Sequence, residues 1–169
     1  VGSNRTLLEA MSVEVMGFSF YALKKRYLPK NKLWLVSEHF QDGVQVVLDS
    51  GIHQLEGSGA SKEEITSFAA EYQEFVANNL ERISGFVEID SQVMGLDWVL
   101  QQRAFFEHDP KLWVVWHDSY GLQSLREWSK TYRNVAIPHA SIEASTSLAG
   151  VTRALVSQQG TRFHALGSA

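Results

Sequence analysis

Short apolar segments of strand length alternate with segments of helical periodicity along most of this chain, and the alternation limits the folds it can adopt. The apolar segments are β-branched and continuous rather than alternating with polar residues, which is typical of parallel strands covered on both faces. The strand candidates, in chain order, are a segment near Val13–Phe20, then Val44–Leu48, Gly85–Ile89, Leu112–Trp116, Val135–Ile137 and Arg162–Leu166.

The segments between these strands carry helix signals. Ser61 is followed three residues later by Glu64, which predicts a capping box at the start of a helix. Apolar residues then recur at helical spacing, and the same pattern returns in three later segments. The expected helices cover Ile65–Val76, Leu96–Leu100, Leu122–Trp128 and Leu148–Val156, the last closed by Gly160, with a shorter helix over Lys32–Phe40.

A strand followed by a helix, repeated along the chain, implies parallel strands joined by right-handed crossovers. Roughly six such units between residues 13 and 169 predict an incomplete TIM-type β/α barrel, because a complete barrel has about eight. The whole chain, 1–169, is expected to be one barrel domain, truncated relative to its parent protein. An open, doubly wound six-stranded sheet fits the same length and stays as the alternative.

Composition narrows the classes of partner. The net charge is −4, so no general positive field favours nucleic acid. The chain has no cysteine, which excludes disulfides and thiolate zinc sites. No apolar run reaches the ~20 residues of a membrane span and no signal peptide is visible, so we expect a cytoplasmic protein without a membrane partner. Positive charge is concentrated at Lys24, Lys25 and Arg26, either as a solvated face or as a contact to nucleic-acid phosphates.

Polar side chains stand where most of the predicted strands end. In parallel α/β folds the chemistry gathers at the carboxyl ends of the strands, although an Asp there also serves as a helix cap or fixes a turn. A histidine and carboxylate set at adjacent strand ends also has the residue types of a metal site, but such histidines serve equally well without a metal, and no metal is expected. The strand-end residues are Asp49 and Ser50, Asp90, His117 and Asp118, and His139.

The residues around these ends resemble a known family. Val47–Gln54 (VLDSGIHQ) resembles the motif Leu-Thr-Asp-Ser-Gly-Gly-Phe-Gln of the tRNA-guanine transglycosylases, and Phe86–Asp90 is similar to the family's next strand, which ends in a base-recognising Asp. The later matches keep the family's order over roughly residues 44–169, and they are nearest to the phage and bacterial branch that acts on DNA with 7-deazaguanine bases. They are Leu112–His117 with Tyr120 and Leu125-Arg126, Tyr132–Ile142, and Arg162–Gly167.

The resemblance implies exchange of guanine for a 7-deazaguanine base in DNA or tRNA, through a covalent glycosyl-enzyme intermediate. Asp49 would be the catalytic residue that contacts the base or handles a proton, with Ser50 beside it. Asp90 would accept hydrogen bonds from the guanine edge. His117 stands where the family has a base-reading Gln, and His139, with Pro138, replaces a Gly-Gly pair beside the base.

The chain also departs from the family. The family's nucleophilic Asp follows the strand after Gly167, beyond the last residue here, and its zinc site of three Cys and one His has no counterpart. We therefore expect no cofactor in this chain and an enzyme that is a base-exchange transglycosylase or a fragment of one. Two alternatives stay open: a β/α-barrel hydrolase with Asp49 and Asp90 as an acid/base pair, and a non-catalytic binding or assembly module in which these carboxylates are caps.

Overall fold

The computed structural model describes residues 15–26, 45–144 and 146–167, and within them the strands follow one another in the order of the sequence, β1-β2-β3-β4-β5-β6. The recorded pairs β1–β2, β2–β3, β4–β5 and β5–β6 are parallel. A doubly wound sheet would reverse its strand order at a switch point, and this order does not reverse. The fold is therefore α/β with the topology of an incomplete β/α barrel, as predicted. The strands are β1 (Val15–Ser19), β2 (Gln45–Asp49), β3 (Gly85–Val87), β4 (Leu112–Val115), β5 (Asn134–Pro138) and β6 (Arg162–Leu166).

Helices lie between the strands, and four of them confirm the helical periodicity: α5 (Lys62–Asn79), α6 (Leu96–Arg103), α7 (Gly121–Thr131) and α9 (Thr146–Gln159). The helix expected over Lys32–Phe40 falls outside the described residues. Short helical segments that the sequence did not predict also occur, namely α2 (Phe20–Arg26), α4 (Ile52–Gly57), the 3-10 turn η1 (Asp118–Tyr120) and α8 (His139–Ala144). The chain divides into two compact units, one ending at Phe86 and the other beginning at Val87.

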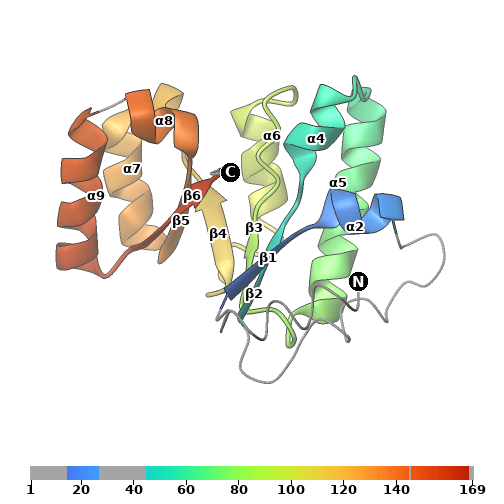
Figure 1. The fold of residues 1–169 in the computed structure, drawn as a ribbon, viewed down its shortest axis with the longest axis horizontal. Coiled ribbons are helices and arrows are strands. Elements are labelled where there is room, and N and C mark those ends of the chain that lie inside the picture. The colour runs from blue at the N-terminus through green and yellow to red at the C-terminus, as the bar shows by residue number, and fades with distance from the viewer. Residues whose placement is uncertain (1–14, 27–44, 145, 168–169) are drawn as a thin grey trace, which may run out of the picture. The chain divides into compact units, whose positions relative to one another are not determined.

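In the first unit, α5 packs its apolar stripe against α2, and Figure 1 shows the two helices together. The predicted capping box is present, because the Glu64 amide donates to the Ser61 hydroxyl (3.2 Å) and the Ser61 amide donates to the Glu64 carboxylate (2.7 Å). The ring of Phe20 lies 5.3 Å from that of Phe68 and 5.4 Å from that of Tyr72. The Tyr72 hydroxyl donates to the Leu48 carbonyl, which anchors α5 to β2.

A tight turn at Gly51 follows β2 in the same unit. Gly51 has a φ of +72°, in the left-handed region that favours glycine, and it caps the start of α4. A Cβ at this position would lie 2.3 Å from Ser19 Oγ and 2.7 Å from Tyr21 Cβ. The Tyr21 amide donates to the Ser50 carbonyl (3.2 Å). Glycine is therefore required here because the end of β1 and the start of α2 lie too close to Gly51 to leave room for a side chain.

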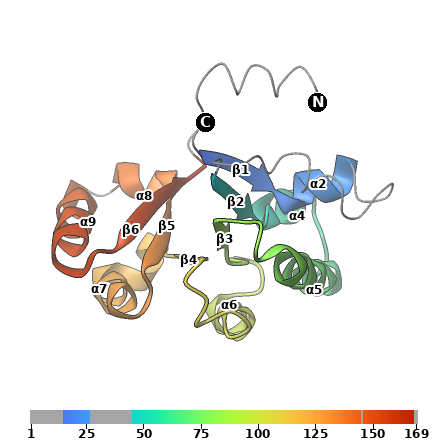
Figure 2. The same ribbon diagram turned by 90° about the horizontal axis from the view of Figure 1, so that it is seen from below.

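In the second unit, β4 and β5 are almost wholly buried, and Figure 2 shows α7 and α9 on the same side of β5 and β6. Trp116 follows β4, is 1% exposed, and donates its indole N–H to Ser124 Oγ (3.0 Å). Leu125 of α7 and Leu148 of α9 are equally buried beside these strands. The indole contact of Trp116 holds the end of β4 against α7, and His117 is the next residue along the chain.

Replacement of Gly51 by alanine should destabilise the fold more than the same change at Gly59. Both glycines have positive φ, so both variants carry the left-handed strain of roughly 1 kcal/mol. Only Gly51→Ala also meets neighbouring atoms, since nothing lies within 4 Å of a Cβ at Gly59. Urea unfolding should show an additional loss of about 1–3 kcal/mol for Gly51→Ala. Equal losses would contradict the packing described for this turn.

Candidate functional site

A buried ion pair lies directly behind the ends of β3 and β4. Arg103, in the last turn of α6, donates from Nε to Glu88 Oε2 (2.7 Å) and from a terminal nitrogen to Glu88 Oε1 (2.9 Å), and both side chains are 2% exposed. Glu88 Oε1 also accepts from the Val115 amide. Glu88 stands two residues before Asp90, and Val115 stands two residues before His117. The Glu88 carboxylate therefore connects the chain segment that carries Asp90 with the one that carries His117.

Aromatic rings enclose the guanidinium of this pair. The Arg103 guanidinium lies 4.3 Å from the ring centre of Trp128 and 5.1 Å from that of Tyr132. Burial raises the pKa of the Glu88 carboxyl, and the Arg103 guanidinium and the Val115 amide oppose that shift by stabilising the charged form. A buried charge without such partners would destabilise the folded state by roughly 3–5 kcal/mol. The two side chains therefore stay together in one geometry.

The structure brings Asp90 and His117 into contact at the two strand ends. His117 Nε2 lies 3.2 Å from Asp90 Oδ2, and the side chains are 11% and 6% exposed, respectively. A carboxylate buried to this degree needs hydrogen-bond donors, and the imidazole N–H supplies one. The two residues form a buried polar contact between the ends of β3 and β4, and we call them the Asp90–His117 pair.

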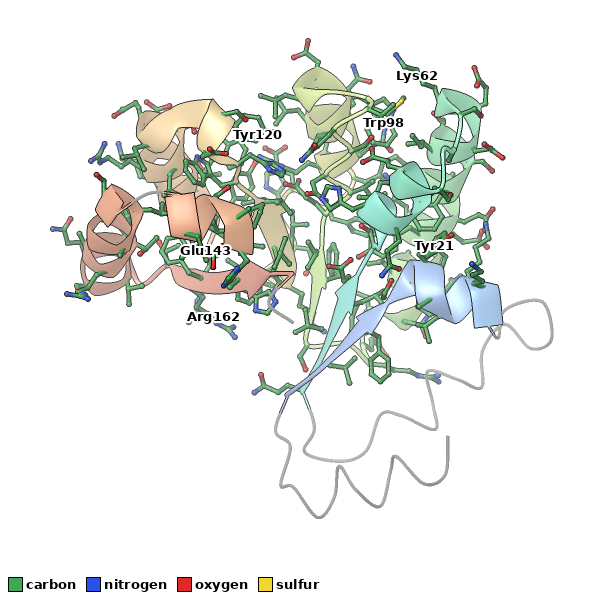
Figure 3. All side chains as sticks on the ribbon, turned by 45° about the horizontal axis from the view of Figure 1, so that its top comes forward. Tyr21, Lys62, Trp98, Tyr120, Glu143 and Arg162 are labelled. Carbon is green, nitrogen blue, oxygen red and sulfur yellow. The ribbon has the colours of Figure 1, made fainter. Side chains whose placement is uncertain are left out.

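Tyr120 completes the surroundings of this pair. Its ring lies edge-on to the His117 ring, with centres 5.4 Å apart, and 5.6 Å from the ring of Trp128. Figure 3 labels Tyr120 where η1 leads into α7. Burial raises the pKa of the Tyr120 phenol, and the negative charges of Asp90 and Glu88 raise it further. The phenol therefore stays protonated at neutral pH and can act as a donor.

The end of β5 contributes a different contact. Ser141 Oγ of α8 donates to Asp118 Oδ1 (3.3 Å), which connects the ends of β4 and β5. His139 begins α8, and its Nδ1 lies 3.7 Å from Oε1 of Glu143, the α8 residue labelled in Figure 3. The His139 side chain is 45% exposed. Within the described ranges, no group of three His, Asp or Glu side chains is arranged to hold a metal ion.

Asp49 and Ser50 lie in the first unit, where both act in the turn before α4. Asp49 Oδ1 accepts from the Gly51 amide, and Ser50 Oγ accepts from the Ile52 amide (3.3 Å). Ser50 is 1% exposed, whereas Asp49 is half-buried. These are the hydrogen bonds expected of strand-end residues that fix a turn, so the turn role of both residues is established whatever further role they have.

The positive patch of α2 lies in the same unit. Lys24 Nζ forms an ion pair with Glu71 of α5 and lies 5.8 Å from the ring centre of Phe68. Lys25 Nζ lies 5.9 Å from the ring centre of Tyr21. The Arg26 side chain is outside the described part of the structure. The charge of Lys24 is thus offset by Glu71, which weakens the patch as a contact for phosphates.

Comparisons with known proteins add no family to this description: no family model, curated protein or solved structure matches the chain. The zinc site implied by the resemblance does not fit, since three of its four ligands are cysteines and this sequence has none. No helix in the described ranges combines the length and apolar character needed to cross a membrane.

Glu88 and Arg103 were not predicted as site residues, although the sequence carries a signal for them. Glu88 is the one charged residue inside the apolar run Gly85–Ile89, and Arg103 continues the helical spacing of Leu96 and Val99. A charge on an expected buried face needs a partner of opposite sign. The sequence does not show which two charges meet, because that depends on how α6 lies against β3.

Arg103→Met should leave the Glu88 charge without its partner and cost about 3–5 kcal/mol of unfolding free energy. Without the guanidinium, the folded-state pKa of Glu88 rises further above its unfolded value, so the folded state binds more protons. The stability of the variant should therefore fall as the pH rises from about 5 to about 7.5. Denaturant unfolding at both pH values measures this.

Arg153→Met is the matched control, because Arg153 is exposed. It should change stability by no more than about 0.5 kcal/mol. A loss of similar size in both variants, or an Arg103→Met deficit that does not depend on pH, would contradict the buried ion pair.

Proposed function

We propose that the second unit binds the Watson–Crick edge of a guanine-type base at the Asp90–His117 pair. We further propose that the chain is part of a transglycosylase-like enzyme, which exchanges guanine for a 7-deazaguanine base in DNA or tRNA. The observation that supports the binding step is the buried Asp90 carboxylate in contact with the His117 ring at adjacent strand ends.

The chemistry of a guanine edge matches these groups. Guanine presents two neighbouring donors, N1–H and the 2-amino group, and a carboxylate has two oxygens that accept such parallel hydrogen bonds. Hydrogen bonds to a charged group are strengthened where water is excluded, and Asp90 is 5% exposed. Tyr120 adds a protonated phenol and an aromatic ring next to His117. Together these groups favour a planar ligand that has both donors and acceptors.

The exchange reaction places further demands on such a protein. The target base must leave the stack, which costs a few kcal/mol and needs a fitted site for the displaced base. A covalent glycosyl-enzyme intermediate would then divide one difficult substitution into two easier steps. In the described residues we assign only base recognition, to Asp90 and His117. The proton-handling role of Asp49, the neighbouring role of Ser50 and contacts of His139 to the base rest on the resemblance alone.

The test is a thermal-shift titration with 7-deazaguanine, comparing the wild type with Asp90→Asn. At a ligand concentration of about 100 times Kd, binding should stabilise the wild type by about 2.7 kcal/mol. Asp90→Asn keeps the shape of the side chain but replaces an acceptor oxygen with an amide NH2 donor, which opposes the donors of the base. We therefore expect the stabilisation to be lost in this variant.

Asp97→Asn provides the control, since Asp97 is an exposed carboxylate in the first turn of α6. It should respond to 7-deazaguanine as the wild type does. Undiminished stabilisation of Asp90→Asn, or no response of the wild type at any soluble concentration of the base, would refute the proposed binding step.

A further inference from the structure

Strand β6 is the outermost strand of the second unit and is paired along one edge only. Its neighbour β5 pairs with it along its whole length, and no other described strand lies beside it. The Arg162 amide donates to the Arg133 carbonyl, just before β5 (2.7 Å). Successive amides of a strand point to alternate edges, so those of Phe163 and Ala165 face the open edge. Open amides and carbonyls of this kind form a template for a further strand.

The side chains of β6 are also less covered than those of its neighbours. Every residue of β4 is buried, and in β5 only Pro138 is partly exposed, whereas every residue of β6 is exposed or half-buried. Phe163 and Ala165 point to the face on which α9 lies, and Figure 2 shows that helix beside β6. A strand added at the open edge would cover part of their apolar surface, which favours apolar side chains at the neighbouring positions.

The other face of β6 carries two side chains that can donate hydrogen bonds. Arg162, labelled in Figure 3, and His164 are two residues apart in the strand and therefore share this face. The Arg162 guanidinium lies 5.3 Å from the ring centre of Trp113 in β4, and the His164 ring lies edge-on to the same indole at 5.8 Å. Trp116, three residues after Trp113, turns its own indole to α7. Arg162 and His164 are thus held on the face away from the helices.

The charge of Arg162 is not offset by a carboxylate. Within the described ranges its guanidinium forms no ion pair, and the side chain is exposed. A guanidinium that lies over an indole keeps its N–H fork free, and this fork matches the two oxygens of a carboxylate. The imidazole of His164 has an N–H donor in either neutral tautomer. A strand beside β6 would place two of its own residues, two apart in its sequence, next to Arg162 and His164, and carboxylates there complement both donors.

A second copy of this chain does not bring such a strand from its outermost strands. Strand β1, at the other end of the strand order, has the sequence VMGFS and no acidic residue. A second β6 would bring another Arg162 and His164 instead of carboxylates. Charge therefore favours a different polypeptide over a second copy.

We infer that the open edge of β6 is an interaction surface for an extended segment of another polypeptide, in which two acidic residues alternate with apolar residues. The segment adds to the sheet as a strand, and its backbone pairs with the open amides and carbonyls of β6. One of its carboxylates accepts from the Arg162 guanidinium and the other from the His164 ring. The inference does not depend on the proposed function, because neither residue belongs to the Asp90–His117 pair.

The probe is the blocked peptide Thr-Val-Glu-Val-Glu-Val-Thr, titrated into ¹⁵N-labelled protein. The amide signals of Phe163 and Ala165 should shift and their hydrogen exchange should slow, because these amides gain acceptors. The uncharged counterpart Thr-Val-Gln-Val-Gln-Val-Thr should bind at least about tenfold more weakly. The isomer Thr-Val-Val-Glu-Glu-Val-Thr should be weakened similarly, because adjacent glutamates point to opposite faces of a strand.

Arg162→Glu is the decisive variant, and Arg153→Glu in α9 is its matched control at another exposed arginine. The charge reversal at Arg162 should exchange the preference, so that Thr-Val-Lys-Val-Lys-Val-Thr binds more tightly than the glutamate peptide. Arg153→Glu should keep the wild-type preference for glutamate. Urea unfolding establishes that each variant is folded before the titration.

Equal affinities of the wild type for the glutamate, glutamine and isomeric peptides would overturn the inference. So would shifts confined to residues outside β6, a glutamate preference that persists in Arg162→Glu, or no binding of the glutamate peptide at millimolar concentration. If Arg162→Glu does not fold, the comparison of the three peptides on the wild type decides.

Discussion

The site in the second unit depends on one interaction, the buried ion pair between Glu88 and Arg103. The Glu88 carboxylate accepts from the Val115 amide of β4 and from Arg103 of α6. The Arg103 guanidinium lies over the ring of Trp128 in α7. Such a pair contributes little net stability because desolvating both charges offsets their attraction. Its effect is geometric, since neither charge can move without leaving the other uncompensated. The ends of β3 and β4 are thereby held at the separation at which Asp90 meets His117.

The strand ends differ in what their polar residues do. Asp49 and Ser50 direct hydrogen bonds to the amides of the next turn, which is the ordinary role of such residues after a strand. Asp90 and His117 instead contact each other across two strands, although they are 27 residues apart in sequence. A contact of this kind fixes the tautomer of a histidine and places two polar groups in a buried environment, which is typical of functional sites.

Much of the fold could be predicted because its signals are local. The capping box at Ser61 and the β-branched strand runs depend on neighbouring residues alone, and the structure confirms them. The short helices α4 and α8 were not predicted, because six residues span less than two turns and show no clear periodicity. His139 directly follows β5, as predicted, but its contact with Glu143 inside α8 was not predicted. The partner of Glu88 was not identifiable, because the pairing depends on how α6 lies against the β3 segment.

The central claim is that the Asp90–His117 pair binds a guanine-type base, and the ring signals of His117 test it most directly. Long-range ¹H–¹⁵N NMR of histidine-labelled protein reports the surroundings of each histidine ring. On saturation with 7-deazaguanine, the ring signals of His117 should shift, while those of the exposed His108 stay unchanged. A His117 ring that keeps its free-state shifts when the base is saturating would contradict the claim.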